Sequence, residues 1–219
     1  MPDALPRIVV LISGGGSNFQ ALIDAEAAGT LEGTIAGVVS NRAGVKGLKR
    51  AESAGIPAQV IPHRDHDSRD SFDRTLMAAI DGFSPDLVVL AGFMRILTDA
   101  FVQHYQGRLL NIHPSLLPAW PGLHTHRKVL EAGEAEHGAT VHFVTEELDG
   151  GPPVIRGRVR VRPDDDEDSL AARVGVQERR IYPEAVRWFC QGRLCLTQGR
   201  AQLDGAPLDE PVDIDAQNA

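Results

Sequence analysis

The sequence predicts an α/β fold with a mostly parallel central sheet and helices on both faces. Short, uninterrupted apolar runs rich in Val, Ile and Leu recur along the first half of the chain. Such runs are typical of strands buried on both faces. Segments with helical apolar spacing separate them, and glycine or capping residues mark the boundaries. Strands that alternate with helices favour parallel pairing through crossover connections.

The elements of the first half follow from these boundaries. Strands are predicted over residues 7–13, 34–40, 56–61 and 86–92, and the apolar run from Leu109 starts a fifth. Helices are predicted over residues 19–28, 45–54 and 98–105, and another opens at Asp67 with Phe72, Leu76 and Ile80 on one face. Because ligands of such sheets bind at the carboxyl ends of the strands, residues that follow each strand are the candidates for a site.

The sequence of the second half of the chain predicts antiparallel strands toward the C-terminus. Strands are expected over 139–145 and 154–161, a long helix from about 169 to 191, and a closing hairpin over 193–198 and 201–203. Residues 206–219 are acidic and poor in apolar groups, so we expect a flexible tail there. Residues 1–205 are expected to form a single domain, since no repeat or linker divides them.

Composition excludes several functional classes. The 219 residues are 42% hydrophobic with a formal net charge of −8, which argues against nucleic-acid partners and against an anionic membrane surface. No apolar run approaches the roughly 18 residues of a spanning helix, and the N-terminus lacks a signal-peptide pattern. Cys190 and Cys195 are too few for a disulfide scaffold, which favours the cytoplasm. A monomer and a homodimer both remain open.

A glycine turn follows the first strand. Gly14, Gly15 and Gly16 precede Ser17, Asn18 and a predicted helix, an arrangement that lets backbone N–H groups approach a phosphate. The turn lacks both the G-x-G-x-x-G pattern of dinucleotide sites and the Lys-Ser/Thr of a P-loop. A single phosphate ester therefore fits better than a dinucleotide or a nucleoside triphosphate. The alternative is a plain helix-capping turn.

An amide and an imidazole share one face at the end of the fifth predicted strand. Asn111 and His113 alternate along the strand, and prolines at 114, 118 and 121 stiffen the segment that follows. Such a pair can stabilise negative charge on a carbonyl oxygen and move a proton. The alternative is a core pair whose polar atoms are satisfied by backbone groups.

Other polar residues are candidates for the same edge. Asp149, in an acidic and glycine-rich turn, is a candidate partner for His113, although Asp is common in turns for conformational reasons. Glu178 lies beside the apolar face of the long helix and could bind a ligand amine or hydroxyl. His124 and His126 have no nearby Asp, Glu or Cys to complete a ligand set, so no metal is expected.

Four segments together resemble one family. Ile12–Asn18 (ISGGGSN), Ala91–Leu97 (AGFMRIL), Asn111–Pro118 (NIHPSLLP) and Leu148–Pro152 (LDGGP) are similar to motifs of the folate-dependent phosphoribosylglycinamide formyltransferases. The resemblance covers about residues 7–204. It implies a Rossmann-like formyltransferase fold and a formyl transfer from the co-substrate N10-formyltetrahydrofolate to phosphoribosylglycinamide, without a metal.

The resemblance also implies roles for individual residues. Asn111, His113 and Asp149 match the catalytic trio of the family. Residues implied to bind the ribonucleotide are Gly16, Ser17, Asn18 and Glu178, and those implied to bind the folate are Arg69, Met94, Arg95, Leu97 and Asn111. Two positions depart from the family pattern: Gly15 stands where Asn is usual, and Pro153 where an aliphatic residue is common.

The sequence leaves several rival functions open. A 10-formyltetrahydrofolate hydrolase of the same superfamily carries an extra domain before its glycine loop, whereas six residues precede the first predicted strand here. A transfer-RNA formyltransferase would need an RNA-binding domain, which this acidic chain lacks. A non-catalytic nucleotide-binding module and a Rossmann dehydrogenase are the readings from other classes, and the missing G-x-G-x-x-G pattern argues against the dehydrogenase.

Overall fold

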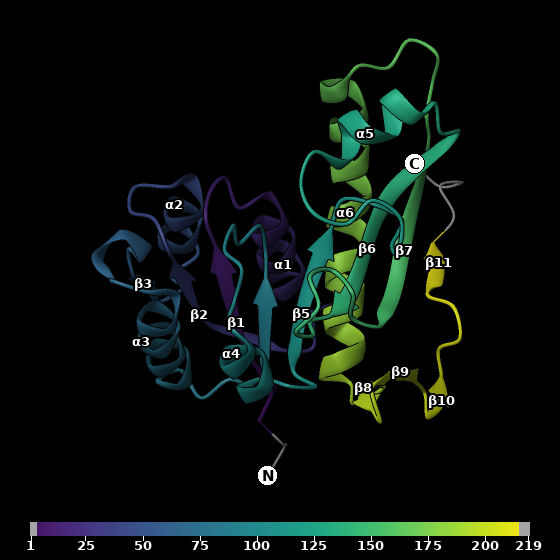
Figure 1. Cartoon of the computed structure of the whole chain (residues 1–219). Coiled ribbons are helices and arrows are strands. Elements are labelled where there is room, and N and C mark those ends of the chain that lie inside the picture. The colour runs from purple at the N-terminus through teal and green to yellow at the C-terminus, as the bar shows by residue number, and fades with distance from the viewer. Residues whose placement is uncertain (1–3, 215–219) are drawn as a thin grey trace.

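A computed structural model describes residues 4–214, whose elements form one large and one small sheet with helices around them (Figure 1). The strands of the large sheet are β1 (Arg7–Ile12), β2 (Thr34–Ser40), β3 (Ala58–Val60), β4 (Leu87–Leu90), β5 (Leu109–His113), β6 (Glu136–Phe143), β7 (Pro153–Arg160) and β11 (Val212–Ile214). The small sheet contains β8 (Leu194–Thr197), β9 (Arg200–Leu203) and β10 (Ala206–Pro207). The helices are α1 (Ser17–Ala27), α2 (Lys46–Ser53), α3 (Arg69–Asp81), α4 (Asp99–His104), α5 (Thr125–Ala132) and α6 (Glu167–Cys190), with a 3₁₀ turn η1 (His63–Asp65).

The large sheet is mostly parallel, as predicted. Its strand order is β11-β7-β6-β5-β4-β1-β2-β3. Strands β1 to β5 pair in parallel with one another, β6 is antiparallel to both β5 and β7, and β11 adds in parallel to β7. The small antiparallel sheet follows α6, so the predicted antiparallel C-terminal strands are also confirmed.

Helices cover both faces of the large sheet. In β1, Ile8, Val10 and Ile12 pack into one core and Val9 and Leu11 into the other, because side chains alternate along a strand. The first core receives side chains from α1, α2, α5 and α6, and the second receives them from α3 and α4. Both cores are continuous across several strands, which explains why the first-half strands read as unbroken apolar runs.

The long helix α6 is hydrogen-bonded to the large sheet through a buried tyrosine. The hydroxyl of Tyr182, fully buried, donates toward the carbonyls of Leu90 and Leu110 at 2.9 and 3.1 Å. These carbonyls belong to the neighbouring strands β4 and β5. A reciprocal capping box of Asp166 and Ser169 starts the helix. These hydrogen bonds therefore fix the position of α6 relative to β4 and β5.

The expectation of a flexible tail from residue 206 is wrong for residues 206–214. β10 pairs with β9, and β11 extends the large sheet along β7 (Figure 1). Val212 and Ile214 pack against the core, while the Asp213 carboxylate accepts hydrogen bonds from Arg156 at 2.7 Å and Arg158 at 3.0 Å. Three residues are too few for periodicity to reveal a strand. Residues 215–219 lie outside the described residues.

None of the helices between residues 4 and 214 combines the length and the apolar composition that a membrane-spanning helix requires.

Candidate active site

The site lies where β1, β4 and β5 end. The backbone N–H of Ser13 donates to the Gly92 carbonyl at 3.1 Å, and the Met94 N–H donates to Ser13 Oγ at 2.8 Å. These two bonds join the segments that follow β1 and β4. Because β5 is parallel to β4, its last residues Asn111 and His113 arrive at the same edge.

His113 is a buried imidazole between two acceptors. Its Nδ1 lies 3.3 Å from the Asp149 Oδ2, and its Nε2 lies 3.0 Å from the Trp120 carbonyl oxygen. The His113 and Asp149 side chains are each 8% exposed. An imidazolium can donate from both nitrogens to these two acceptors, whereas a neutral ring can donate from only one. The arrangement thus accommodates the charged ring.

Asp149 owes its position to the shape of its loop. Its backbone has φ of +53°, in the left-handed region that Asp adopts more readily than most residues. Its Oδ2 also accepts the Gly122 N–H at 2.9 Å, which ties the loop after β6 to the proline-rich segment after β5. The same residue thus shapes the turn and contacts His113.

His142 lies beside Asn111 and was not identified as a site residue from the sequence. It faces Asn111 across the antiparallel pair β5–β6, and the Asn111 Nδ2 lies 3.2 Å from the His142 Nε2. The His142 Nδ1 lies 2.9 Å from the Phe143 carbonyl, so Nδ1 carries the proton and Nε2 accepts from Asn111. Burial lowers the pKa of His142, which agrees with a neutral ring. The amide of Asn111 is thereby oriented, with a second N–H left available.

Only the strand pairing could have revealed His142. Its place on the polar face of the strand was visible in the sequence, but its partner lies 31 residues away. Pro153, one of the two departures from the family pattern, begins β7 opposite His142 at a shift in the strand register. Proline lacks an N–H and is tolerated at such a position.

The glycine turn forms one wall of a cavity of about 400 Å³. The residues lining it are Ser13–Asn18, Arg42, Ala91, Gly92, Met94, Ile112, Pro114 and Glu178. The predicted ribonucleotide residues are therefore brought together, and Ile112 and Pro114 connect this cavity to the strand that bears Asn111 and His113. Gly16 has φ of +69°, which glycine adopts without strain.

Glu178 reaches the glycine turn from α6. Its Oε2 accepts a hydrogen bond from the Asn18 Nδ2 at 3.1 Å. Burial raises the pKa of the Glu178 carboxyl, and the Asn18 hydrogen bond opposes this shift. The Asn18 Oδ1 is buried without a partner among the described residues. This pair therefore offers a carboxylate and an amide oxygen to hydroxyl or amine donors of a ligand.

Arg42 is a second residue that the sequence analysis missed. It is the one cationic side chain among those lining the cavity. Its backbone is held by the Ser40 hydroxyl, which donates to the Arg42 carbonyl at 2.7 Å. Its guanidinium forms no ion pair with the residues that the structure describes. The signal was its place two residues after the second predicted strand, at the edge where ligands bind.

The residues predicted to bind folate are only partly gathered. Met94, 61% exposed, lines the cavity, and Asn111 lies in the cluster with His142. Arg95 lies over the ring of Phe72 in α3, at 5.8 Å from its centroid, and Leu97 packs in the same core. Arg69 is exposed at the start of α3, three residues before Phe72, and does not line the cavity.

His124 and His126, the two histidines considered as metal ligands, do not form part of a metal-binding group. His124 precedes α5 in a left-handed conformation, and the His126 Nδ1 lies 2.9 Å from the buried His137 Nε2. Across residues 4–214, no three His, Cys, Asp or Glu side chains gather as a metal-binding group would.

Comparison with known proteins decides the family. Residues 6–186 match the family described as Formyl transferase. The phosphoribosylglycinamide formyltransferase of Escherichia coli strain K12 is 56% identical over 202 residues, which cover 92% of this chain and 95% of that protein. The chain belongs to the phosphoribosylglycinamide formyltransferases. The resemblance inferred from the four motifs is therefore confirmed, and the Rossmann dehydrogenase reading is wrong.

Solved structures of formyltransferases share the fold. The phosphoribosylglycinamide formyltransferase of Coxiella burnetii superposes with a TM-score of 0.92 at 49% identity, covering 97% of this chain and all of that one. A formyltetrahydrofolate deformylase from Pseudomonas syringae superposes with a TM-score of 0.85 at 25% identity, and this chain covers 66% of it. The transferase is thus the more similar of these two in both sequence and extent.

Proposed function

We propose that this phosphoribosylglycinamide formyltransferase moves the formyl group of N10-formyltetrahydrofolate to the amine of 5'-phosphoribosylglycinamide, a step of purine biosynthesis. The observation that carries the proposal is the cluster of Asn111, His113 and Asp149 beside the cavity of the glycine turn. The three side chains offer oxyanion-stabilising donors. The cavity offers backbone amides and polar groups for a phosphorylated sugar. Family membership supports the same reaction.

The reaction needs one oxyanion site and one proton path. The substrate amine attacks the formyl carbon, and the carbonyl oxygen gains negative charge as a tetrahedral intermediate forms. The free N–H of Asn111 and the imidazolium of His113 stabilise that oxygen, with Asp149 holding the charged ring. The amine then loses a proton, N10 of the folate gains one, and the carbon–N10 bond breaks.

In the present conformation, the Trp120 carbonyl occupies the position where His113 would contact the substrate oxygen. It lies 3.0 Å from the His113 Nε2, the ring nitrogen that does not face Asp149. We propose that the substrate oxygen takes the place of the Trp120 carbonyl, so that the segment carrying Trp120 shifts when the folate binds.

The other predicted residues bind the two substrates. Gly16, Ser17, Asn18 and Glu178 bind the ribonucleotide, and Met94, Arg95, Leu97 and Arg69 line the path of the folate, whose tail Arg69 meets. No metal takes part. The thiols of Cys190 and Cys195 are both free, which suits a cytoplasmic enzyme.

The decisive experiment is absorbance-monitored deformylation of 10-formyl folate by the purified protein, with and without glycinamide ribonucleotide. Turnover that requires the ribonucleotide supports the transferase. Equal turnover without it would replace the proposal with the hydrolase. Ligand binding without turnover in either case would indicate a non-catalytic nucleotide-binding module.

A further inference from the structure

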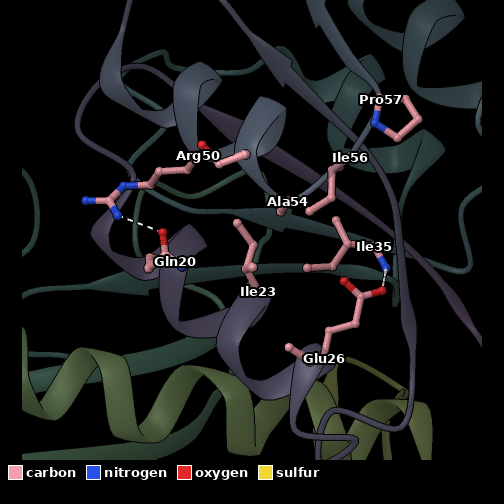
Figure 2. A pocket seen from close by; sticks show the side chains of 11 residues that line it. Gln20, Ile23, Glu26, Ile35, Arg50, Ala54, Ile56 and Pro57 are labelled. Atoms are coloured by element: carbon pink, nitrogen blue, oxygen red, sulfur yellow. Dashed lines mark hydrogen bonds between the residues drawn. The ribbon is translucent and has the colours of Figure 1, made fainter.

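The glycine turn has its carbonyl groups tied from behind by α2. The Gly47 backbone N–H donates to the Gly14 carbonyl at 3.0 Å, and the Arg50 Nε donates to the Gly15 carbonyl at 3.0 Å. A second arm of Arg50 donates to the Gln20 Oε1 of α1 at 2.7 Å, as Figure 2 shows. Arg50 is thereby fixed by two acceptors from two different segments.

These contacts determine where the amides of the turn point. The peptide bonds here are trans, and in a trans peptide the N–H points opposite to the preceding C=O. With the Gly14 and Gly15 carbonyls directed at α2, the N–H groups of Gly15 and Gly16 point away from α2. Neither N–H has a hydrogen-bond partner among the residues that the structure describes.

The side away from α2 is the site cavity. Residues 13–18 line that cavity, whereas no residue of α2 does. Arg50 instead borders a separate hollow of about 570 Å³ between α1, α2 and the segment before β3 (Figure 2). The glycine turn therefore separates Arg50 from the site, and Arg50 acts on a ligand only through the backbone.

The turn and α2 approach too closely to admit a side chain between them. A Cβ on Gly47 would lie 2.4 Å from the Ile12 Cδ1, and a Cβ on Gly16 would lie 2.9 Å from the Gly47 Cα. Glycine at both positions permits the close approach that the two carbonyl contacts require.

We propose that Arg50 is a positioning residue for the ribonucleotide phosphate: by holding the Gly15 carbonyl toward α2, it directs the Gly16 N–H into the site. The proposal rests on the proposed function for the identity of the ligand. The orientation of the amide itself depends only on the contacts above.

Two variants and one control test this role. Arg50→Gln removes the charge and the double contact. Arg50→Lys keeps the charge but replaces the planar guanidinium, which donates to the two acceptors from two separate nitrogens, with a single ammonium nitrogen. Lys49→Gln is the matched control, because Lys49 is exposed on the same helix and its substitution removes the same positive charge. Thermal unfolding checks that each variant is folded.

The first readout is binding of inorganic phosphate, followed by the NMR shifts of the Gly15 and Gly16 amides. We expect Arg50→Gln to weaken phosphate binding about tenfold, Arg50→Lys to weaken it less, and Lys49→Gln to leave it within about twofold. Equal losses in Arg50→Gln and Lys49→Gln, or none in either, would overturn the proposal. If Arg50→Gln does not fold, Arg50→Lys must still bind phosphate more weakly than Lys49→Gln, and binding equal to that control would also overturn it.

The second readout is steady-state kinetics. We expect Arg50→Gln to raise the KM for the ribonucleotide about tenfold while kcat and the KM for the folate stay within about twofold. A fall in kcat with an unchanged KM would contradict a positioning role at the phosphate. Absence of turnover in the unmodified protein would refute the proposed function instead, while phosphate binding would still test Arg50.

Discussion

At the residue scale, Asn111 and His113 each have a side chain held by one neighbouring residue. One of the Asn111 amide N–H groups is held by the neutral His142, so the other has a fixed direction. Its strand neighbour His113 is held in the same way by Asp149. Preorganised donors of this kind stabilise charge without reorganising during the reaction.

Asn111→Ala is expected to lower kcat by roughly 10²–10³-fold, because one oxyanion donor is lost. The substitution should leave the KM for the ribonucleotide nearly unchanged, since Asn111 lies outside the residues lining that cavity. Steady-state turnover with both substrates measures the effect. Gln59→Ala, which removes an exposed amide from β3, is the control. Turnover of Asn111→Ala within about threefold of the control would remove Asn111 from the mechanism.

At the element scale, α6 connects the core to the site. The same helix carries Tyr182, whose hydroxyl lies on the carbonyls of β4 and β5, and Glu178, which reaches Asn18 one turn earlier. The position of Glu178 over the cavity therefore depends on how the helix is fastened.

Tyr182→Phe is expected to lower the free energy of unfolding by about 1–3 kcal/mol, because a buried donor is removed and its acceptors lose a partner. Urea denaturation measures the change. Tyr105→Phe is the matched control, since its hydroxyl bonds the carboxylate of Asp81, whose side chain is 43% exposed, and should cost less. A smaller loss for Tyr182→Phe than for Tyr105→Phe would contradict this account of the helix.

Strand β11 offers a second test at this scale. Asp213→Ala should lower the free energy of unfolding by about 1 kcal/mol, because its carboxylate bonds both Arg156 and Arg158 across the edge of the sheet. Glu210→Ala, whose 78% exposed carboxylate lies 3.6 Å from Arg156, should change it little. Chemical denaturation of the two variants distinguishes them, and equal values would mean that the Asp213 pairs contribute nothing specific.

At the scale of the whole molecule, buried neutral histidines make stability depend on pH. The pKa of His137 is lowered from 6.5 to about 4, chiefly by burial and in smaller part by the adjacent His126 and His113. The pKa values of His126 and His142 are also lowered, chiefly by burial. In the unfolded chain these rings bind protons at higher pH than in the folded one, so the folded state loses stability as pH falls.

The expected result is a decline in the free energy of unfolding as pH falls from about 6.5 toward 4, with His137 contributing up to roughly 3 kcal/mol. Denaturation midpoints measured across that range test it. His137→Gln, which keeps a polar side chain facing His126 but does not titrate, should flatten the profile, whereas His104→Gln at an exposed position should not. A profile of the unmodified protein that stays level from pH 7 to 5 would be inconsistent with these shifts.

The sequence alone determined the features that short stretches encode. Apolar runs and caps specify strands and helices locally, so the α/β class, the glycine turn after β1 and the pair Asn111 and His113 could all be predicted. Motifs of a few residues sufficed for the family, because ligand-binding residues of α/β sheets generally lie at the ends of strands and in the loops directly after them.

The tertiary structure alone decided the contacts between distant segments. His142 meets Asn111 through the register of an antiparallel pair, Arg50 meets Gly15 across 35 residues, and β11 joins β7 across more than 50. The Trp120 carbonyl beside His113 likewise depends on how one loop folds back. Periodicity carries no information about such pairings, because register and loop closure are set by the packing of the entire sheet.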